Sequence, residues 1–116
     1  MGPIFVNQSN IAMYQISFYV PASHVEQVKN ALFAAGAGRL GGYEHCAWQT
    51  LGQGQFKPLP GSTPYSGKVD QLESVEEYKV EMICAEDCIS AALQALLAVH
   101  PYEQPAYSIC KMLTLA

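Results

Sequence analysis

The feature that most limits how this chain can fold is a strict alternation of apolar and polar residues in two segments far apart in the sequence. The apolar positions are Tyr14, Ile16, Phe18 and Val20 within residues 14–20, and Tyr78, Val80, Met82 and Cys84 within residues 73–84. Successive side chains of a β-strand point to opposite faces of its sheet. The alternation therefore predicts two strands, each with one face in the core and one in water.

Each of these strands is followed by a segment with helical spacing. In the first segment, Ser23 and Glu26 have the spacing of a capping box, and Gly36 suits the end of a helix. Its apolar residues are Val25, Val28, Leu32 and Ala35. In the second, Glu86 and Asp87 stand where a helix dipole favours anions. Its apolar stripe is Ile89, Leu93, Leu96 and Leu97. Both patterns predict amphipathic helices.

Two further strands and one long loop complete the pattern. Residues 43–51 are predicted as a strand. Residues 106–113 are predicted as the last strand, and their nearly continuous apolar character suits a central or interface position. Residues 52–67 are rich in glycine and proline. A loop of this length inside a small domain is usually functional.

The resulting order, β-α-β-β-α-β, predicts an α+β, ferredoxin-like sandwich, in which a four-stranded antiparallel sheet carries two helices on one face. We expect residues 13–116 to form this single domain, because 116 residues suffice for one core and not for two. Residues 1–12 are expected to be a tail, either a cloning remnant or part of an upstream start. Two of the four strands lie at sheet edges, and this favours self-association.

Composition narrows the choice of partners and compartment. The six Lys and Arg residues are spread singly through a chain of net charge −4. Nucleic acids and anionic membranes are bound by clustered cations, so we expect neither as a partner. Residues 1–12 carry no Lys or Arg, so we expect no secretory signal there. The four cysteines are then expected to be free thiols of a cytoplasmic protein.

Five strings, taken together in their order, resemble one known family. They are FYVP (18–21), AGAGRLGGYEHCAW (35–48), GQGQFKPLPGSTPYSG (52–67), ESVEEYKVE (73–81) and HPYEQPAY (100–107). Across about residues 13–113 they resemble the insert domain of YqfO-type members of the Ngg-interacting-factor-three-like family. The HPYE string is also similar to a segment of the divalent-ion-tolerance protein CutA.

The resemblance implies a fold similar to CutA and the PII signalling proteins, which are ferredoxin-like and typically trimeric. It also implies a stand-alone insert domain. The di-metal site of the full-length family belongs to a larger domain, which we expect to be absent here. The type-2 GTP cyclohydrolase activity attached to part of that family is therefore not expected of this chain.

Candidate site residues gather after the second helix. His100 and Glu103 offer an imidazole and a carboxylate three residues apart, which suits proton exchange or a metal ion. Equally, Pro101 would end the helix while Tyr102 packs and His100 caps the last carbonyls. Glu76 has the parity of the apolar face, where a carboxylate needs a partner unless it reaches solvent at the strand end. The predicted ligand-binding residues are His100, Tyr102, Glu103, Glu76 and Tyr43, and no catalytic residue is assigned.

A divalent metal ion is the predicted cofactor, if there is one. Its predicted ligands are His100, Glu103, Cys46 and His45. Adjacent strand residues point to opposite faces, so His45 and Cys46 would rarely share one ion, and Cys46 suits a buried thiol equally well. Cys84 and Cys88 read as structural thiols, because a zinc site normally needs a second closely spaced pair.

Three functions fit these features. The first is a homo-oligomeric ligand-binding or regulatory module, with a trimer favoured over a dimer and a subunit-boundary cleft lined by the HPYE segment and residues 52–67. The second is a CutA-like divalent-metal-binding protein. A metal-dependent hydrolase comes third, because three histidines cannot rebuild a di-metal site. A docking role on a separate partner is a further alternative. We therefore expect a binding module before an enzyme.

Overall fold

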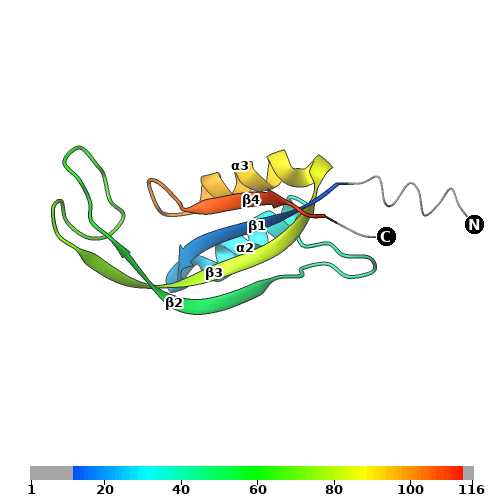
Figure 1. Ribbon diagram of the computed structural model, residues 1–116, viewed down its shortest axis with the longest axis horizontal. Helices are drawn as coiled ribbons and strands as arrows, with labels where there is room; N and C mark the ends of the chain where they lie inside the picture. Colours follow the sequence, from blue (N-terminus) through cyan, green and yellow to red (C-terminus); the bar gives the residue numbers. More distant parts are fainter. Residues whose placement is uncertain (1–11, 114–116) are drawn as a thin grey trace, which may run out of the picture.

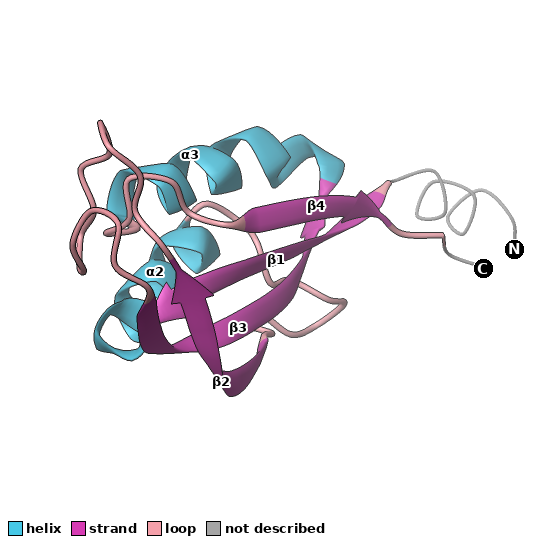
Figure 2. Ribbon diagram, turned by 60° about the vertical axis from the view of Figure 1, so that its left-hand side comes forward, coloured by secondary structure: helices cyan, strands magenta, loops and turns pink. Residues whose placement is uncertain are grey.

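The computed structural model describes residues 12–113 and contains a four-stranded antiparallel sheet with two helices on one face (Figures 1 and 2). The strands are β1 (Met13–Pro21), β2 (Trp48–Phe56), β3 (Glu73–Ala85) and β4 (Tyr107–Lys111). The helices are α2 (Val25–Ala34) and α3 (Ile89–Val99), preceded by the 3-10 turns η1 (Ala22–His24) and η2 (Glu86–Cys88). The predicted ferredoxin-like fold is confirmed. Residues 1–11 of the predicted tail and residues 114–116 lie outside the described part.

The core lies between the sheet and the helices. The fully buried side chains come from both central strands and both helices. They include Ile16, Phe18 and Val20 of β1, Val80 and Cys84 of β3, Val28 and Leu32 of α2, and Ala92 and Leu96 of α3. The face predicted from the period of two is therefore the helix-covered face. Burying a Leu, Ile or Phe side chain stabilises the fold by about 1.5–3 kcal/mol.

The strand order is β2-β3-β1-β4, so β2 and β4 are the edges. β1 lies between β3, where Phe18 opposes Val80, and β4, where Ser17 opposes Ser108. Within residues 12–113, β4 pairs with β1 alone, so the central position predicted for residues 106–113 is wrong. The alternative, an interface strand, stays a prediction. Most side chains of β4 are exposed.

β2 is displaced along the sequence from its prediction. It starts at Trp48 and continues to Phe56, into the segment predicted as a loop. Gly52 and Gly54 lie opposite Glu77 and Val75 of β3. Glycine and glutamine carry no apolar alternation, so only the backbone pairing with β3 makes this segment a strand. The loop between β2 and β3 then spans residues 57–72, which we call the cleft loop.

The predicted capping box does not form. The 3-10 turn η1 moves the start of α2 to Val25, so His24 holds the N-cap position and Ser23 stands one residue too early. Ser23 Oγ instead lies 2.8 Å from His24 Nδ1. Glu26 pairs with Lys29 at 2.9 Å.

The start of β1 and the end of β4 lie next to each other, because the two strands are antiparallel neighbours (Figure 1). The Met112 backbone N–H donates to the Met13 carbonyl at 2.8 Å. Within residues 12–113, both helices are too short to cross a membrane.

Candidate functional site

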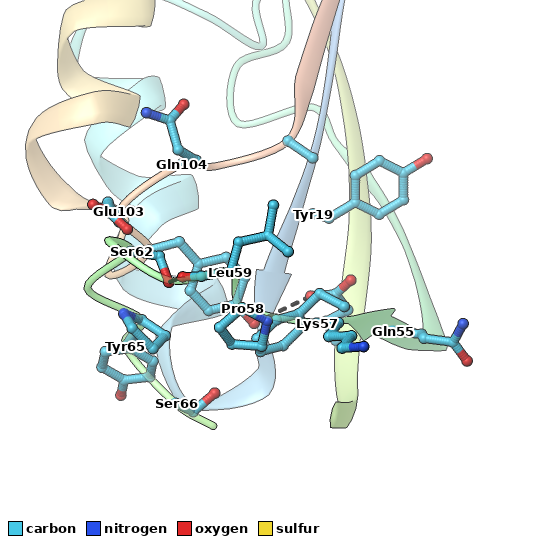
Figure 3. Close-up of a pocket in the computed structure, with 15 residues that line it drawn as sticks. Tyr19, Gln55, Lys57, Pro58, Leu59, Ser62, Tyr65, Ser66, Glu103 and Gln104 are labelled. Atoms are coloured by element: carbon cyan, nitrogen blue, oxygen red, sulfur yellow. Dashed lines mark hydrogen bonds between the residues drawn. The ribbon is translucent and has the colours of Figure 1, made fainter. Parts of the chain in front are cut away.

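A cleft of about 410 Å³ opens where the end of β2 passes into the cleft loop (Figure 3). Its two walls come from the cleft loop and from residues 100–106, the segment that follows α3. Apolar and aromatic side chains make up most of its surface, among them Phe56, Pro58, Leu59, Pro64 and Tyr65. The HPYE segment and the long loop were expected to line a cleft between subunits. They meet within one chain, so the cleft exists without a partner.

The cleft loop is held at its neck and at its tip. The Asp70 N–H donates to the Pro58 carbonyl at 2.8 Å, which closes the neck. The Thr63 N–H donates to Glu103 Oε1 at 2.9 Å and ties the loop to the opposite wall. The Tyr65 ring meets the His24 ring edge-on, with centroids 5.8 Å apart. These contacts give the loop a defined shape next to the cleft.

Glu77 and Tyr102 form a polar pair in the wall. The Tyr102 hydroxyl donates to Glu77 Oε2 at 3.2 Å. Burial, followed by the neighbouring Glu77 charge, raises the pKa of Tyr102 to about 12, so this phenol keeps its proton at neutral pH. The Glu77 side chain lies over Gly54, where a β-carbon would collide with the carboxylate. The missing side chain of Gly54 thus makes the room that Glu77 occupies.

His100 lies behind this pair and is buried. Its Nε2 is 2.6 Å from the Tyr19 carbonyl, and its Nδ1 is 3.2 Å from the Tyr102 N–H. These partners require a neutral ring that carries its proton on Nε2 and accepts on Nδ1. Burial lowers the pKa of His100, which also favours the neutral form. The imidazole therefore fixes the backbone that carries Tyr102.

The predicted ligand-binding residues are divided between several places. Tyr102 and Glu103 line the cleft, and His100 lies beneath Tyr102, with ring centroids 4.9 Å apart. Glu76 is exposed and does not line the cleft, whereas its neighbour Glu77 does. Tyr43 is 76% exposed. It belongs to the segment between α2 and β2, which lies at the opposite end of the sheet from the loop between α3 and β4 (Figure 1).

The predicted metal ligands also lie apart. His45 stacks on Phe33 with ring centroids 4.6 Å apart, and the Cys46 N–H donates to the Gly38 carbonyl at 2.8 Å. Both belong to the segment between α2 and β2. This segment lies at the opposite end of the sheet from the loop between α3 and β4, which contains His100 and Glu103 (Figure 1). In the described part of the chain, no three His, Cys, Asp or Glu side chains come together as a metal site. Metal binding by this set stays a prediction.

Several lining residues were not singled out from the sequence. They are Tyr19, Lys57, Tyr65 and Glu77. Tyr65 and Lys57 lie in the glycine- and proline-rich segment that was flagged as functional, so that signal was present. Glu77 had a weaker signal, namely two glycines in the facing strand that leave space beside it. Without the register of β2 against β3, this space could not be assigned.

The fold is that of a ferredoxin-like α+β domain, and solved structures of CutA proteins share it. The divalent ion tolerance protein CutA1 from Ehrlichia chaffeensis has this fold, with a TM-score of 0.67 over 92% of this chain and 87% of that protein. At 14% identity, the similarity is one of fold alone.

Closer relatives identify the family. The GTP cyclohydrolase 1 type 2 homolog of Halalkalibacterium halodurans is 42% identical over 98 residues, which are 84% of this chain and 26% of that protein. The crystal structure of a Bacillus cereus protein related to NIF3 gives a TM-score of 0.76 at 35% identity, over 88% of this chain and 26% of that one. No family model matches the sequence. The chain belongs to the NIF3-related, YqfO-type family, and it spans about a quarter of the length of the curated relatives it matches.

Proposed function

We propose that this domain is a small-molecule-binding, regulatory module that works as a homo-oligomer in the cytoplasm. The observation that carries the proposal is the cleft between the cleft loop and residues 100–106. Its volume of about 410 Å³ falls within the ~300–1,000 Å³ that is typical of small-ligand sites. Its mostly apolar wall with a few polar groups is also typical of such sites.

The polar groups of the cleft suit recognition better than catalysis. His100 has both ring nitrogens occupied by backbone groups, and Tyr102 holds its proton against Glu77. Across residues 12–113 the cleft shows no nucleophile aligned with a general base. The GTP cyclohydrolase name of the longer relatives is therefore not extended to this domain.

Self-association is proposed from the sheet. Its face opposite the helices carries the exposed side chains Tyr19, Trp48 and Cys110, and no other layer of residues 12–113 covers it. β2 and β4 offer unpaired edges. The family resemblance implies a trimer, with a dimer as the alternative. The four free thiols support the cytoplasm as the compartment.

A screen of small metabolites by thermal shift, followed by calorimetry, tests the cleft. In Ala106→Trp, an indole is placed in the cleft wall. In Ala98→Trp, which is the matched control, the same residue is added on the exposed side of α3. We expect a compound that binds the wild type and the control and fails to bind Ala106→Trp. A compound that binds all three equally occupies another site and overturns the proposal.

A further inference from the structure

We propose that the cleft selects an organic cation, meaning a ligand with a flat apolar body and a protonated amine, and that it rejects polyphosphates. This inference rests on the proposed function, since it names the ligand class of the same cleft. Three kinds of observation carry it: the charges of the wall, the unused hydrogen-bonding positions and the aromatic rings.

The charges of the wall sum to one negative charge. Glu77 and Glu103 contribute two negative charges and Lys57 one positive charge. Lys57 makes no ion pair with either carboxylate in the described part of the chain. A ligand with several negative charges would thus meet two carboxylates and one ammonium group, within a chain whose net charge is −4. A monocation is attracted by the same arrangement.

The two carboxylates each have an unused acceptor. Glu77 Oε2 accepts from Tyr102, and Glu103 Oε1 accepts from the Thr63 N–H. The second oxygen of each carboxylate has no hydrogen-bond partner within residues 12–113. Each carboxylate is held by its first bond, so a ligand would bind it at little further entropic cost. The free oxygen of Glu77, Oε1, lies over Gly54, and Glu103 is exposed at the cleft wall. An ammonium N–H is the donor that such an oxygen binds most strongly.

Several donors that would serve an anion are already used. The Ser62 hydroxyl donates to the Leu59 carbonyl at 2.7 Å, and the Thr63 N–H and the Tyr102 hydroxyl donate to the two carboxylates. Lys57 remains as the cationic donor of the wall. The side chains of Gln55, Tyr65, Ser66 and Gln104 also line the cleft, and their donors make no hydrogen bond within residues 12–113. The two carboxylates, and not a lack of donors, are therefore what disfavours a phosphate here.

Two tyrosine rings complete the site. Tyr65 and Tyr102 both line the cleft, with centroids 6.0 Å apart and planes tilted by 47°. The Tyr19 ring points away from Tyr65 (Figure 3). Aromatic faces attract cations through their ring quadrupole, and they also stack on a flat apolar body. Carboxylates beside tyrosine rings therefore suit an aromatic or cyclic amine.

The test compares three probes that share one ring and differ in charge: benzylamine, benzyl alcohol and benzoate. Titrations followed by amide chemical shifts locate each probe and give its dissociation constant. We expect benzylamine to bind in the cleft about tenfold more tightly than benzyl alcohol, which corresponds to about 1.4 kcal/mol. Benzoate should bind most weakly. Raising the salt concentration should weaken the binding of the amine and leave that of the alcohol unchanged.

Variants assign the preference to the carboxylates. Glu77→Gln and Glu103→Gln should each reduce the preference for the amine severalfold. The control Glu76→Gln removes the same charge from an exposed residue next to Glu77 and should leave the preference intact. The salt titration of the wild type keeps the test valid if Glu77→Gln perturbs the fold.

The outcomes separate this inference from the proposed function. If all three probes bind in the cleft equally, or if benzoate or ATP binds best there, the cleft binds small molecules and the cation preference is wrong. If no probe shifts any resonance of the cleft, while another compound from the metabolite screen does, the cation preference is also wrong. If nothing binds in the cleft, both proposals are overturned.

Discussion

The imidazole of His100 has a backbone partner on each nitrogen, so replacing it should lower the free energy of unfolding. His100→Ala leaves the Tyr19 carbonyl without its donor and opens a cavity, so we expect a loss of about 2–4 kcal/mol in the free energy of unfolding. Urea denaturation at neutral pH measures this loss. Gln94→Ala, which removes an exposed side chain of α3, is the control. A loss below about 0.5 kcal/mol would contradict the structural role of His100.

The same residue predicts a pH dependence. Burial lowers the pKa of His100 in the folded state, so the unfolded chain binds its proton at a higher pH than the folded chain. Stability should therefore fall as the pH drops below about 6.5, the usual pKa of histidine, and level off below the folded pKa. In His100→Ala this part of the slope should disappear. Denaturation midpoints measured between neutral pH and about pH 5 check it.

Single substitutions of the predicted ligands also test whether the protein binds a metal ion. If the predicted ligand set is used, His100→Ala and Glu103→Gln should lower the stoichiometry of bound zinc or copper. Residues 12–113 gather no three ligating side chains, so such a site would draw ligands from two subunits. Native mass spectrometry of protein purified without chelator measures the bound mass. Unchanged stoichiometry in both variants would remove the basis of the metal prediction.

At the scale of elements, β2 makes room for the Glu77 carboxylate because Gly54 has no side chain. In Gly54→Ala the new methyl group would displace the Glu77 carboxylate and break its bond with Tyr102, so we expect a loss of about 1–2 kcal/mol and a fall in the pKa of Tyr102 from about 12. Gly52→Ala, in the same strand and with no atom near the added methyl group, is the matched control. Thermal unfolding and tyrosine titration by NMR measure both effects. If the two variants have equal stability and an equal Tyr102 pKa, Gly54 does not make the room for Glu77.

The elements also show how far the sequence could be read. The alternation of apolar and polar residues predicted β1 and β3, because one face of each strand is buried against the helices. The helical spacing of apolar residues predicted α2 and α3 in the same way. β2 was misplaced because backbone pairing with β3, and no side-chain pattern, holds Gly52 and Gly54. Glu76, and not Glu77, was predicted as a ligand-binding residue, because Glu76 is in phase with the apolar face of β3. Parity fails at the start of β3, because Glu76 there is exposed whereas Val80 further along is buried beneath the helices.

At the scale of the whole molecule, thiol reactivity reports the proposed assembly. Cys110 is exposed in the single chain, on the sheet face that we propose is covered in the oligomer. Its reaction with Ellman's reagent should be slow in the oligomer and fast in dilute monomer, and Cys110→Ser should lack this phase. Cys84 should stay unreactive in both, because burial raises its pKa to about 11. Light scattering after size-exclusion chromatography gives the assembly state. Fast Cys110 labelling in a trimer would rule out this face as the interface.

The neighbouring ends of β1 and β4 have a consequence for protein architecture. A chain that enters at Met13 leaves at Met112, only one backbone hydrogen bond away. If such a domain is inserted into a loop of a larger protein, its two ends are already adjacent. The insertion therefore costs the larger protein little loop-closure entropy, although it is about a hundred residues long. The same geometry would let a short linker join the two ends, so that a circular permutant opened within the cleft loop should still form the sheet.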